Sequence, residues 1–305
     1  MSRTAEHRYL IIGGVPKAGT SSLFRWLSGH PQICAARVKE TRFFLDADYP
    51  VPAAVRYDGS NLDEYERFFE EAPAGADRIR VEASPDYLYS ECAKKIPALL
   101  PQARMIFILR EPVERMVSWY RYARQRGLIP ETMTFDDYVD VQVRSDADDS
   151  TPIQFRALDQ CRYDHYLAGF REAFGDRILE LDFGELRDTP GRVMAQVCRF
   201  SDICGEYFRE FSFQPDNVTT GVPESGIRKM YKITRRRIEH LVYDKPRTMS
   251  VLRRLNSLLK VLHSGARVSE FRVQASADAV RRIREFLQSH GENNAQDSRS
   301  SETKN

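Results

Sequence analysis

Short runs of apolar, strand-forming residues alternate along the chain with stretches of helical periodicity. The first run, Tyr9 to Gly13, ends in a glycine pair, and similar runs occupy 78–82, 104–110 and 178–182. Continuous apolar runs of this length are typical of parallel strands that are buried on both faces. Because helical stretches separate the strands, the pattern predicts an α/β fold with three layers, in which helices flank a central parallel sheet.

A helix is predicted directly after the first strand and its glycine loop. Thr20 or Ser21 can cap the amino end of this helix, and Gly29 ends it. Trp26 and Trp119 both fall in predicted helices, where we expect them to pack in the core. The other predicted helices cover about 112–126, 163–174, 190–201, 228–242, 251–262 and 277–288.

The length and composition are those of a globular protein with a sizeable core. The 305 residues are 42% hydrophobic and 30% charged, which fits a single elaborated α/β domain over 1–290. Residues 291–305 are polar and lack aromatic and branched aliphatic side chains. They cannot offset the entropy of ordering, so we expect a disordered tail there.

The formal net charge of +2 is too balanced for a general nucleic-acid-binding protein, whose affinity depends on neutralising phosphates. The charges are unevenly distributed, because residues 228–289 carry 16 basic and 5 acidic residues. We therefore treat 228–290 as a basic helical part of the domain. An apolar stripe between Val251 and Leu262 is flanked by basic residues there, and it fits either core packing or a peripheral contact with an anionic membrane.

The amino end of the chain does not have the pattern of a secretory signal. The apolar run from Tyr9 to Ile12 is much shorter than the ~20 residues needed to span a bilayer. The five cysteines form no CxxC pair, and we expect buried reduced thiols rather than disulfides. We therefore predict a cytoplasmic protein, with a peripheral position on the inner face of the membrane as the alternative.

The loop after the first strand, Gly14 to Ser22, has the glycine spacing of a phosphate-binding loop. A loop that binds nucleoside triphosphates places its lysine after the second glycine, whereas here Thr20 follows Gly19 and Lys17 lies inside the loop. Backbone N–H groups and hydroxyls at the amino end of a helix form an anion cradle that needs no metal. The candidate nucleotide-binding residues are Lys17, Ala18, Gly19, Thr20, Ser21 and Ser22.

The stretch from Pro16 to Ser22 (PKAGTSS) resembles the donor loop of the sulfotransferases that use 3′-phosphoadenosine 5′-phosphosulfate (PAPS). The segment from Leu109 to Ser118 resembles the second signature of that family. The resemblance implies a P-loop-like α/β fold in which Arg110 and Ser118 hold the 3′-phosphate that distinguishes PAPS from ATP. It also implies a basic loop near Arg228, which would be a second ligand of that phosphate.

A third segment, Val38 to Phe44 (VKETRFF), resembles the K-E-x-H-F-F element of glycan sulfotransferases of the heparan type, and its E-T-R core is similar to tyrosylprotein sulfotransferases. In both groups the glutamate of this element is the catalytic base, and the matching residue is Glu40. Arg42 stands where the heparan type has histidine, and a neighbouring guanidinium would weaken Glu40 as a base by lowering its pKa. Glu82, near the end of another predicted strand, is the reserve base.

Sulfuryl transfer requires alignment of the reactants, a base for the acceptor proton and stabilisation of charge on the leaving phosphate. The ammonium of Lys17 can neutralise that phosphate in place of a metal ion, and Glu40 can take the proton. The six histidines form no HxH or HExxH pair, so no metal site is indicated.

We therefore expect a PAPS-dependent sulfotransferase that acts on a hydroxyl of a glycan or glycoconjugate, with an amine as the second choice of acceptor. A phosphoryl-transferring kinase with a P-loop is one alternative, against which the position of Lys17 and the pair Arg110 and Ser118 both argue. The other alternative is a non-catalytic nucleotide-binding protein associated with membranes.

Overall fold

The computed structural model describes residues 7–70, 78–145, 147–148, 150–215 and 273–302. The chain divides into two compact units, residues 1–218 together with 273–305, and residues 219–272. Every described residue belongs to the first unit, and the fold described below is the fold of that unit.

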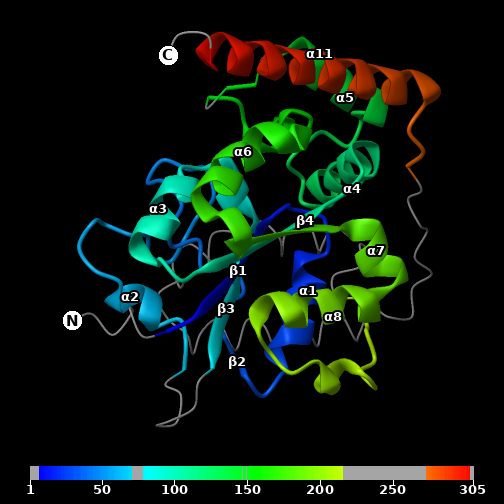
Figure 1. Ribbon diagram of the computed structural model, residues 1–305. Helices are drawn as coiled ribbons and strands as arrows, with labels where there is room; N and C mark the ends of the chain where they lie inside the picture. Colours follow the sequence, from blue (N-terminus) through cyan, green and yellow to red (C-terminus); the bar gives the residue numbers. More distant parts are fainter. Residues whose placement is uncertain (1–6, 71–77, 146, 149, 216–272, 303–305) are drawn as a thin grey trace. The chain divides into compact units, whose positions relative to one another are not determined.

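A sheet of five parallel strands forms the centre of the fold, in the order β2-β3-β1-β4-β5 (Figure 1). All six residues of β1 are buried, as are the middle residues of β4, which explains why these strands read as continuous apolar runs. The predicted strands are confirmed, and β2 is an addition of three residues. The strands are β1 (Tyr9–Gly14), β2 (Ile33–Ala35), β3 (Ile79–Ala83), β4 (Arg104–Leu109) and β5 (Ile178–Asp182).

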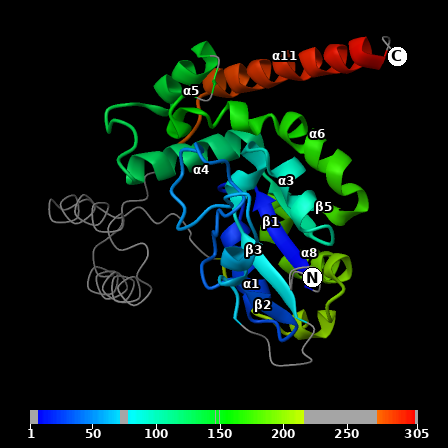
Figure 2. The same ribbon diagram turned by 90° about the vertical axis from the view of Figure 1, so that its left-hand side faces the viewer.

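Helices cover both faces of the sheet, with α1 and α8 on one side and α3 and α6 on the other (Figures 1 and 2). The predicted three-layer α/β architecture is therefore confirmed. The α-helices are α1 (Thr20–Ser28), α2 (Asp63–Glu66), α3 (Cys92–Leu99), α4 (Pro112–Gln125), α5 (Phe135–Arg144), α6 (Tyr163–Phe174), α7 (Phe183–Asp188), α8 (Pro190–Ser201) and α11 (Ala277–Glu302). Short 3₁₀ helices are η2 (Pro85–Tyr89), η3 (Ile153–Phe155), η4 (Asp159–Cys161), η5 (Gly175–Arg177) and η6 (Gly205–Phe208).

Two of the helix predictions differ from the structure, and α2, α3, α5 and α7 were not predicted. The predicted cap of α1 was wrong, because Gly19 in a left-handed conformation takes the N-cap position and Thr20 begins the helix. The last helix, α11, continues to Glu302 and so enters the stretch 291–305 for which we expected no order. Some predictions lie outside the described residues: the helices at 228–242 and 251–262, the apolar stripe and Arg228. The single domain over 1–290 stays a prediction.

The buried apolar side chains form two clusters, one around the sheet and one between α4, α5 and α11. Trp26 lies in the first and Trp119 in the second, as expected. All five cysteines are unpaired; four are buried, and Cys204 is exposed, contrary to expectation.

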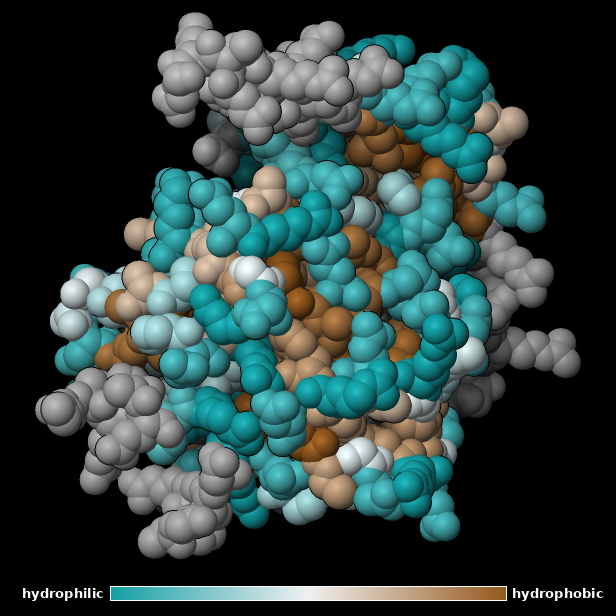
Figure 3. Space-filling model, viewed as in Figure 1, coloured by the Kyte–Doolittle hydropathy of each residue, from teal (hydrophilic) through white to brown (hydrophobic). Residues whose placement is uncertain are grey.

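Hydrophilic side chains cover much of the face in Figure 3, with apolar residues between them. Within the described ranges, the large hydrophobic side chains that are exposed are those of Val141 and Tyr207. None of the described helices combines the length and the apolar character needed to cross a bilayer.

Candidate active site

The loop between β1 and α1 is fastened to the end of β4. The N–H of Val15 donates to the carbonyl of Ile108 at 3.0 Å. At the other end of the loop, Gly19 has a φ of +83°, and a Cβ there would lie 2.9 Å from Cδ2 of Leu186. Both the backbone conformation and the space therefore require glycine at this position.

The start of α1 leaves backbone amides available to a ligand. The N–H groups of Ser22 and Leu23 donate to the carbonyl of Gly19 at 2.9 and 3.1 Å, and no described side chain caps the helix. The amides of Thr20 and Ser21 are therefore among those that can bind an anion. The predicted loop residues lie together around these amides, with Ala18, Thr20 and Ser22 buried and Ser21 half-buried.

Lys17 lies inside the loop with a strained backbone and a perturbed ammonium. Its φ of +74° is left-handed, which costs a non-glycine residue about 1–2 kcal/mol. Its Nζ lies 4.9 Å from the ring centroid of Tyr122 on α4. Burial lowers the pKa of Lys17, as do the nearby cations Arg110, Arg126 and Lys39, to about 8. A bound anion would oppose this effect, so the cluster of cations favours an anionic ligand.

Arg110 starts the turn from β4 into α4 and reaches back to the loop. Its Nη1 donates to the carbonyl of Lys17 at 3.0 Å, and its Nε donates to Glu114 at 3.3 Å. Its guanidinium lies 4.3 Å from the ring centroid of Phe183. Ser118 is half-buried on the adjoining helix. The structure thus brings Arg110 and Lys17 together, while the role of Arg110 and Ser118 as phosphate ligands stays a prediction.

Sequence reasoning missed two residues of this cluster, Tyr122 and Arg126. Tyr122 lies four residues after Ser118, so the two residues share a face of α4. Arg126 lies four residues further on, and its guanidinium is 5.2 Å from the centroid of the Tyr122 ring. Helical spacing from Ser118 is the signal that could have found both residues.

Glu40 lies between β2 and α2 and is held by two cations. Nζ of Lys39 donates to Oε1 at 2.9 Å, and Nη2 of Arg42 donates to Oε2 at 2.5 Å. The side chain of Glu40 is 30% exposed, so an acceptor can reach it. Burial acts to raise the pKa of Glu40, but Lys39 and Arg42 together lower it below the ordinary value. In this arrangement Glu40 is charged and accessible, but a weak base.

Glu82, the reserve base, is enclosed by hydroxyl groups and is 0% exposed. Burial raises the pKa of Glu82, and the hydroxyl donors act in the opposite direction. The structure therefore assigns Glu82 a structural role, because an acceptor substrate cannot contact a carboxylate that is completely buried. The donors are Thr41 at 2.8 Å, Tyr65 at 3.2 Å, Ser84 at 2.6 Å and Tyr87 at 2.8 Å.

The hydrogen bonds of Glu82 fix the backbone that carries Glu40. Ser84, which donates to Glu82, accepts a hydrogen bond from the N–H of Arg42 at 3.0 Å. Arg42 has a φ of +56°, and strained backbone of this kind is concentrated at functional sites. Of the three described non-glycine residues with positive φ, Lys17 and Arg42 lie in the two segments that supply the candidate site, and Asp202 ends α8.

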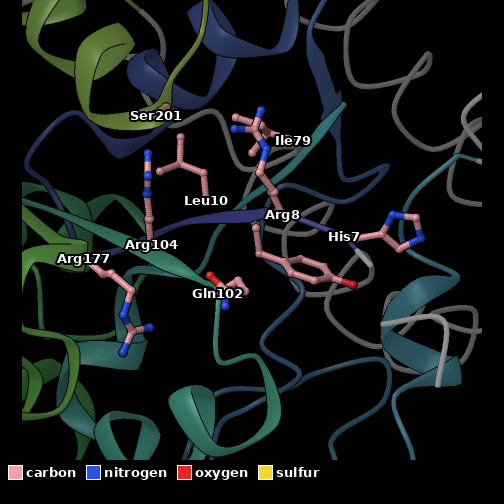
Figure 4. Close-up of a pocket in the computed structure, with 9 residues that line it drawn as sticks. His7, Arg8, Leu10, Ile79, Gln102, Arg104, Arg177 and Ser201 are labelled. Atoms are coloured by element: carbon pink, nitrogen blue, oxygen red, sulfur yellow. The ribbon is translucent and has the colours of Figure 1, made fainter. Parts of the chain in front are cut away.

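A separate cavity of about 180 Å³ lies at the opposite end of the strands (Figure 4). Tyr9, Ile79 and Arg104, which begin β1, β3 and β4, line it, whereas ligands of such sheets bind at the carboxyl ends of the strands. Its arginines have partners, since Arg104 pairs with Asp202 at 2.7 Å and Arg177 donates to backbone carbonyls. We therefore do not place the candidate site there.

Among the described residues no group of three or more His, Cys, Asp or Glu could hold a metal ion.

Comparison with known proteins gives concordant matches. Residues 7–215 match the family described as "Sulfotransferase domain". The bifunctional heparan sulfate N-deacetylase/N-sulfotransferases 1 and 2 of Homo sapiens are each 28% identical to the chain, over 216 and 223 residues. These matches cover 68% of this chain but only 23% and 24% of the two relatives. A sulfotransferase structure from Alicyclobacillus acidocaldarius, 23% identical, has a TM-score of 0.57, covers 80% of this chain and 97% of that chain, and shows the same fold.

Nucleotide affinity should fall as the pH rises through the pKa of Lys17. The free protein loses the charge of Lys17 above about pH 8, so the Kd of adenosine 3′,5′-bisphosphate should increase ~10-fold between about pH 7 and about pH 9.5. Lys17→Arg keeps its charge throughout this range, and its Kd should stay nearly constant. Calorimetry at several pH values checks this, and a wild-type Kd that does not change with pH would contradict it.

Replacing Glu82 by Gln should destabilise the fold by about 1–3 kcal/mol, because the amide N–H₂ would face hydroxyl donors that need an acceptor. Urea unfolding measures the change in the free energy of unfolding. Glu172→Gln is the control at an exposed position, where we expect a change within about 0.5 kcal/mol. Equal stability of Glu82→Gln and the wild type would refute the structural role of Glu82.

Proposed function

The chain belongs to the sulfotransferase family, and we propose that it transfers the sulfuryl group of PAPS to a hydroxyl of a glycan or glycoconjugate, with an amine as the second choice of acceptor. The observation that carries the proposal is the hydrogen bond that joins Arg110 to the loop of Lys17. It supports a single nucleotide site with cations for two separate phosphate groups. The names of the two heparan sulfate relatives support a glycan as the acceptor.

The charges of the candidate site fit a polyanionic nucleotide. Burial lowers the pKa of Lys17, and the nearby cations Arg110, Arg126 and Lys39 lower it further. In the proposed complex, Lys17 and the amides of Thr20 and Ser21 hold the 5′-phosphate, and Arg110 with Ser118 holds the 3′-phosphate. PAPS supplies the sulfuryl group when it is bound there.

In the proposed transfer, Glu40 accepts the proton of the acceptor hydroxyl while the acceptor oxygen bonds to sulfur. The bond from sulfur to the bridging phosphate oxygen breaks, and its electron pair stays on that oxygen. Lys17 neutralises the charge that develops there, as expected for an in-line displacement that relies on positioning and electrostatics. The exposed part of the Glu40 side chain supports this role.

Two substitutions separate this reaction from simple nucleotide binding. Lys17→Ala should abolish transfer from sulfur-labelled PAPS to desulfated, N-acetylated heparin, which offers hydroxyls as acceptors, because the ammonium that neutralises the leaving oxygen is lost. Glu40→Gln should reduce kcat at least ~10²-fold, while the Kd of adenosine 3′,5′-bisphosphate stays within about twofold. Glu172→Gln serves as the matched control, with wild-type turnover.

Measurements of nucleotide binding and sulfuryl transfer also discriminate among the alternatives. Wild-type protein that binds ATP with Mg²⁺ in preference to adenosine 3′,5′-bisphosphate would favour a kinase. Tight binding of the bisphosphate without transfer to any tested acceptor would favour a non-catalytic protein. Unchanged turnover in Glu40→Gln would remove Glu40 as the base.

A further inference from the structure

The proposed base is weaker than its task requires. Lys39 and Arg42 both donate to the carboxylate of Glu40, and together they lower its pKa. A general base works best when its proton affinity is close to that required at the working pH. Another group near Glu40 that competes for these cations would correct the mismatch.

Asp86 is such a group, and no sequence motif points to it. It is the second residue of η2, directly beyond the carboxyl end of β3, and is only 8% exposed. Ser84, two residues earlier, accepts a hydrogen bond from the N–H of Arg42 at 3.0 Å. The hydroxyl of Tyr49 donates to Oδ1 of Asp86 at 3.4 Å. The segment 84–86 is thus bonded at two points to the segment that carries Glu40 and Arg42.

The groups that act on Asp86 are the charges of the proposed acceptor site. Burial raises the pKa of Asp86 to about 6, and Glu40 acts in the same direction, whereas Arg42, Tyr49 and Lys39 act to lower it. The same two cations, Arg42 and Lys39, therefore lower the pKa of both carboxylates. The repulsion between the carboxylates is mutual, so a charged Asp86 also raises the proton affinity of Glu40. The pKa of Tyr49 is in turn raised by burial, Asp86 and Tyr89, whereas Arg156 acts to lower it.

Burial separates the roles of the two carboxylates. The side chain of Glu40 is 30% exposed, whereas Asp86 is 8% exposed, so an acceptor can contact Glu40 and not Asp86. We propose that Asp86 is a positioning residue of the transfer reaction, whose carboxylate competes with Glu40 for the guanidinium of Arg42 and so keeps Glu40 an effective proton acceptor. The inference rests on the proposed function, since it concerns the same proton, which moves from the acceptor hydroxyl to Glu40.

The pH dependence of kcat follows from this arrangement. Asp86 is charged above about pH 6 and neutral below it. When Asp86 becomes neutral, it no longer opposes the effect of Arg42 and Lys39 on Glu40, so the base weakens although Glu40 is still ionised. The acid limb of the kcat profile should therefore lie near the pKa of Asp86, above the range in which Glu40 itself takes up a proton.

Asp86→Asn tests the inference because it removes the charge and keeps an oxygen for the hydroxyl of Tyr49. With sulfur-labelled PAPS and desulfated, N-acetylated heparin, kcat should fall about 10-fold near pH 7.5, and the acid limb near pH 6 should disappear. The Kd of adenosine 3′,5′-bisphosphate should stay within about twofold, and Asp86→Glu should restore part of the activity. Asp46→Asn is the matched control, since Asp46 lies in the same segment but pairs with Lys95 at 2.9 Å; it should keep the wild-type profile.

A second measurement does not depend on activity. Carbon-13 labelling of the Asp and Glu carboxyl groups allows their titration to be followed by NMR in the wild type and in Asp86→Asn. We expect the wild type to show a carboxyl that titrates near pH 6, and Glu40 to titrate at a lower pH in the variant than in the wild type. If Asp86→Asn does not fold, the wild-type titration and the wild-type acid limb decide the matter.

The outcomes distinguish the inference from the function on which it rests. Absence of any transfer by the wild type, with bisphosphate binding intact, overturns the proposed function and the inference with it. Transfer by both proteins with superimposable pH profiles, or an unchanged titration of Glu40, overturns the inference alone. A wild-type acid limb below about pH 5 does the same.

Discussion

The hydrogen bond from the guanidinium of Arg110 to the carbonyl of Lys17 joins two loops whose residues are 93 positions apart in the chain. It forms because β1 and β4 are neighbours in a parallel sheet, so their carboxyl ends meet at the same edge. Burial and the cations around Lys17 lower its pKa. An anionic ligand would relieve the repulsion among these cations, which is why we propose a site for phosphate groups there.

The acceptor half of the site depends on a different buried group. Glu82 accepts hydrogen bonds from four hydroxyls and, through Ser84, fixes the backbone of Arg42 and hence the position of Glu40. Leaving those donors without an acceptor would be costly inside the protein. The same strand end carries Asp86, so β3 supplies both the rigidity of the acceptor half and, on our proposal, part of its electrostatic balance.

The sheet and most helices could be predicted because each is specified by a local pattern, such as the apolar run of β4 or the proline that begins α4. The three residues of β2 are too few to give a periodic signal, and the N-cap of α1 depends on the left-handed backbone of Gly19. Lys17, Arg110 and Glu40 are candidates that motifs suggest, and their roles stay predictions. Tyr122, Arg126 and Asp86 were missed, because their importance comes from distances and burial in three dimensions, and Glu82 was misjudged because sequence does not show how many hydroxyls surround it.

On our proposal, the edge formed by β1 and β4 recognises a nucleotide by its 3′-phosphate as well as its 5′-phosphate. Calorimetric Kd values for adenosine 3′,5′-bisphosphate and adenosine 5′-monophosphate, measured with the wild type and with Arg110→Ala, test it most directly. The wild type should bind the bisphosphate at least ~10-fold more tightly, since a charge-assisted hydrogen bond contributes about 1.5–3 kcal/mol, and Arg110→Ala should lose most of that preference. Equal affinities of the wild type for the two nucleotides would contradict the account.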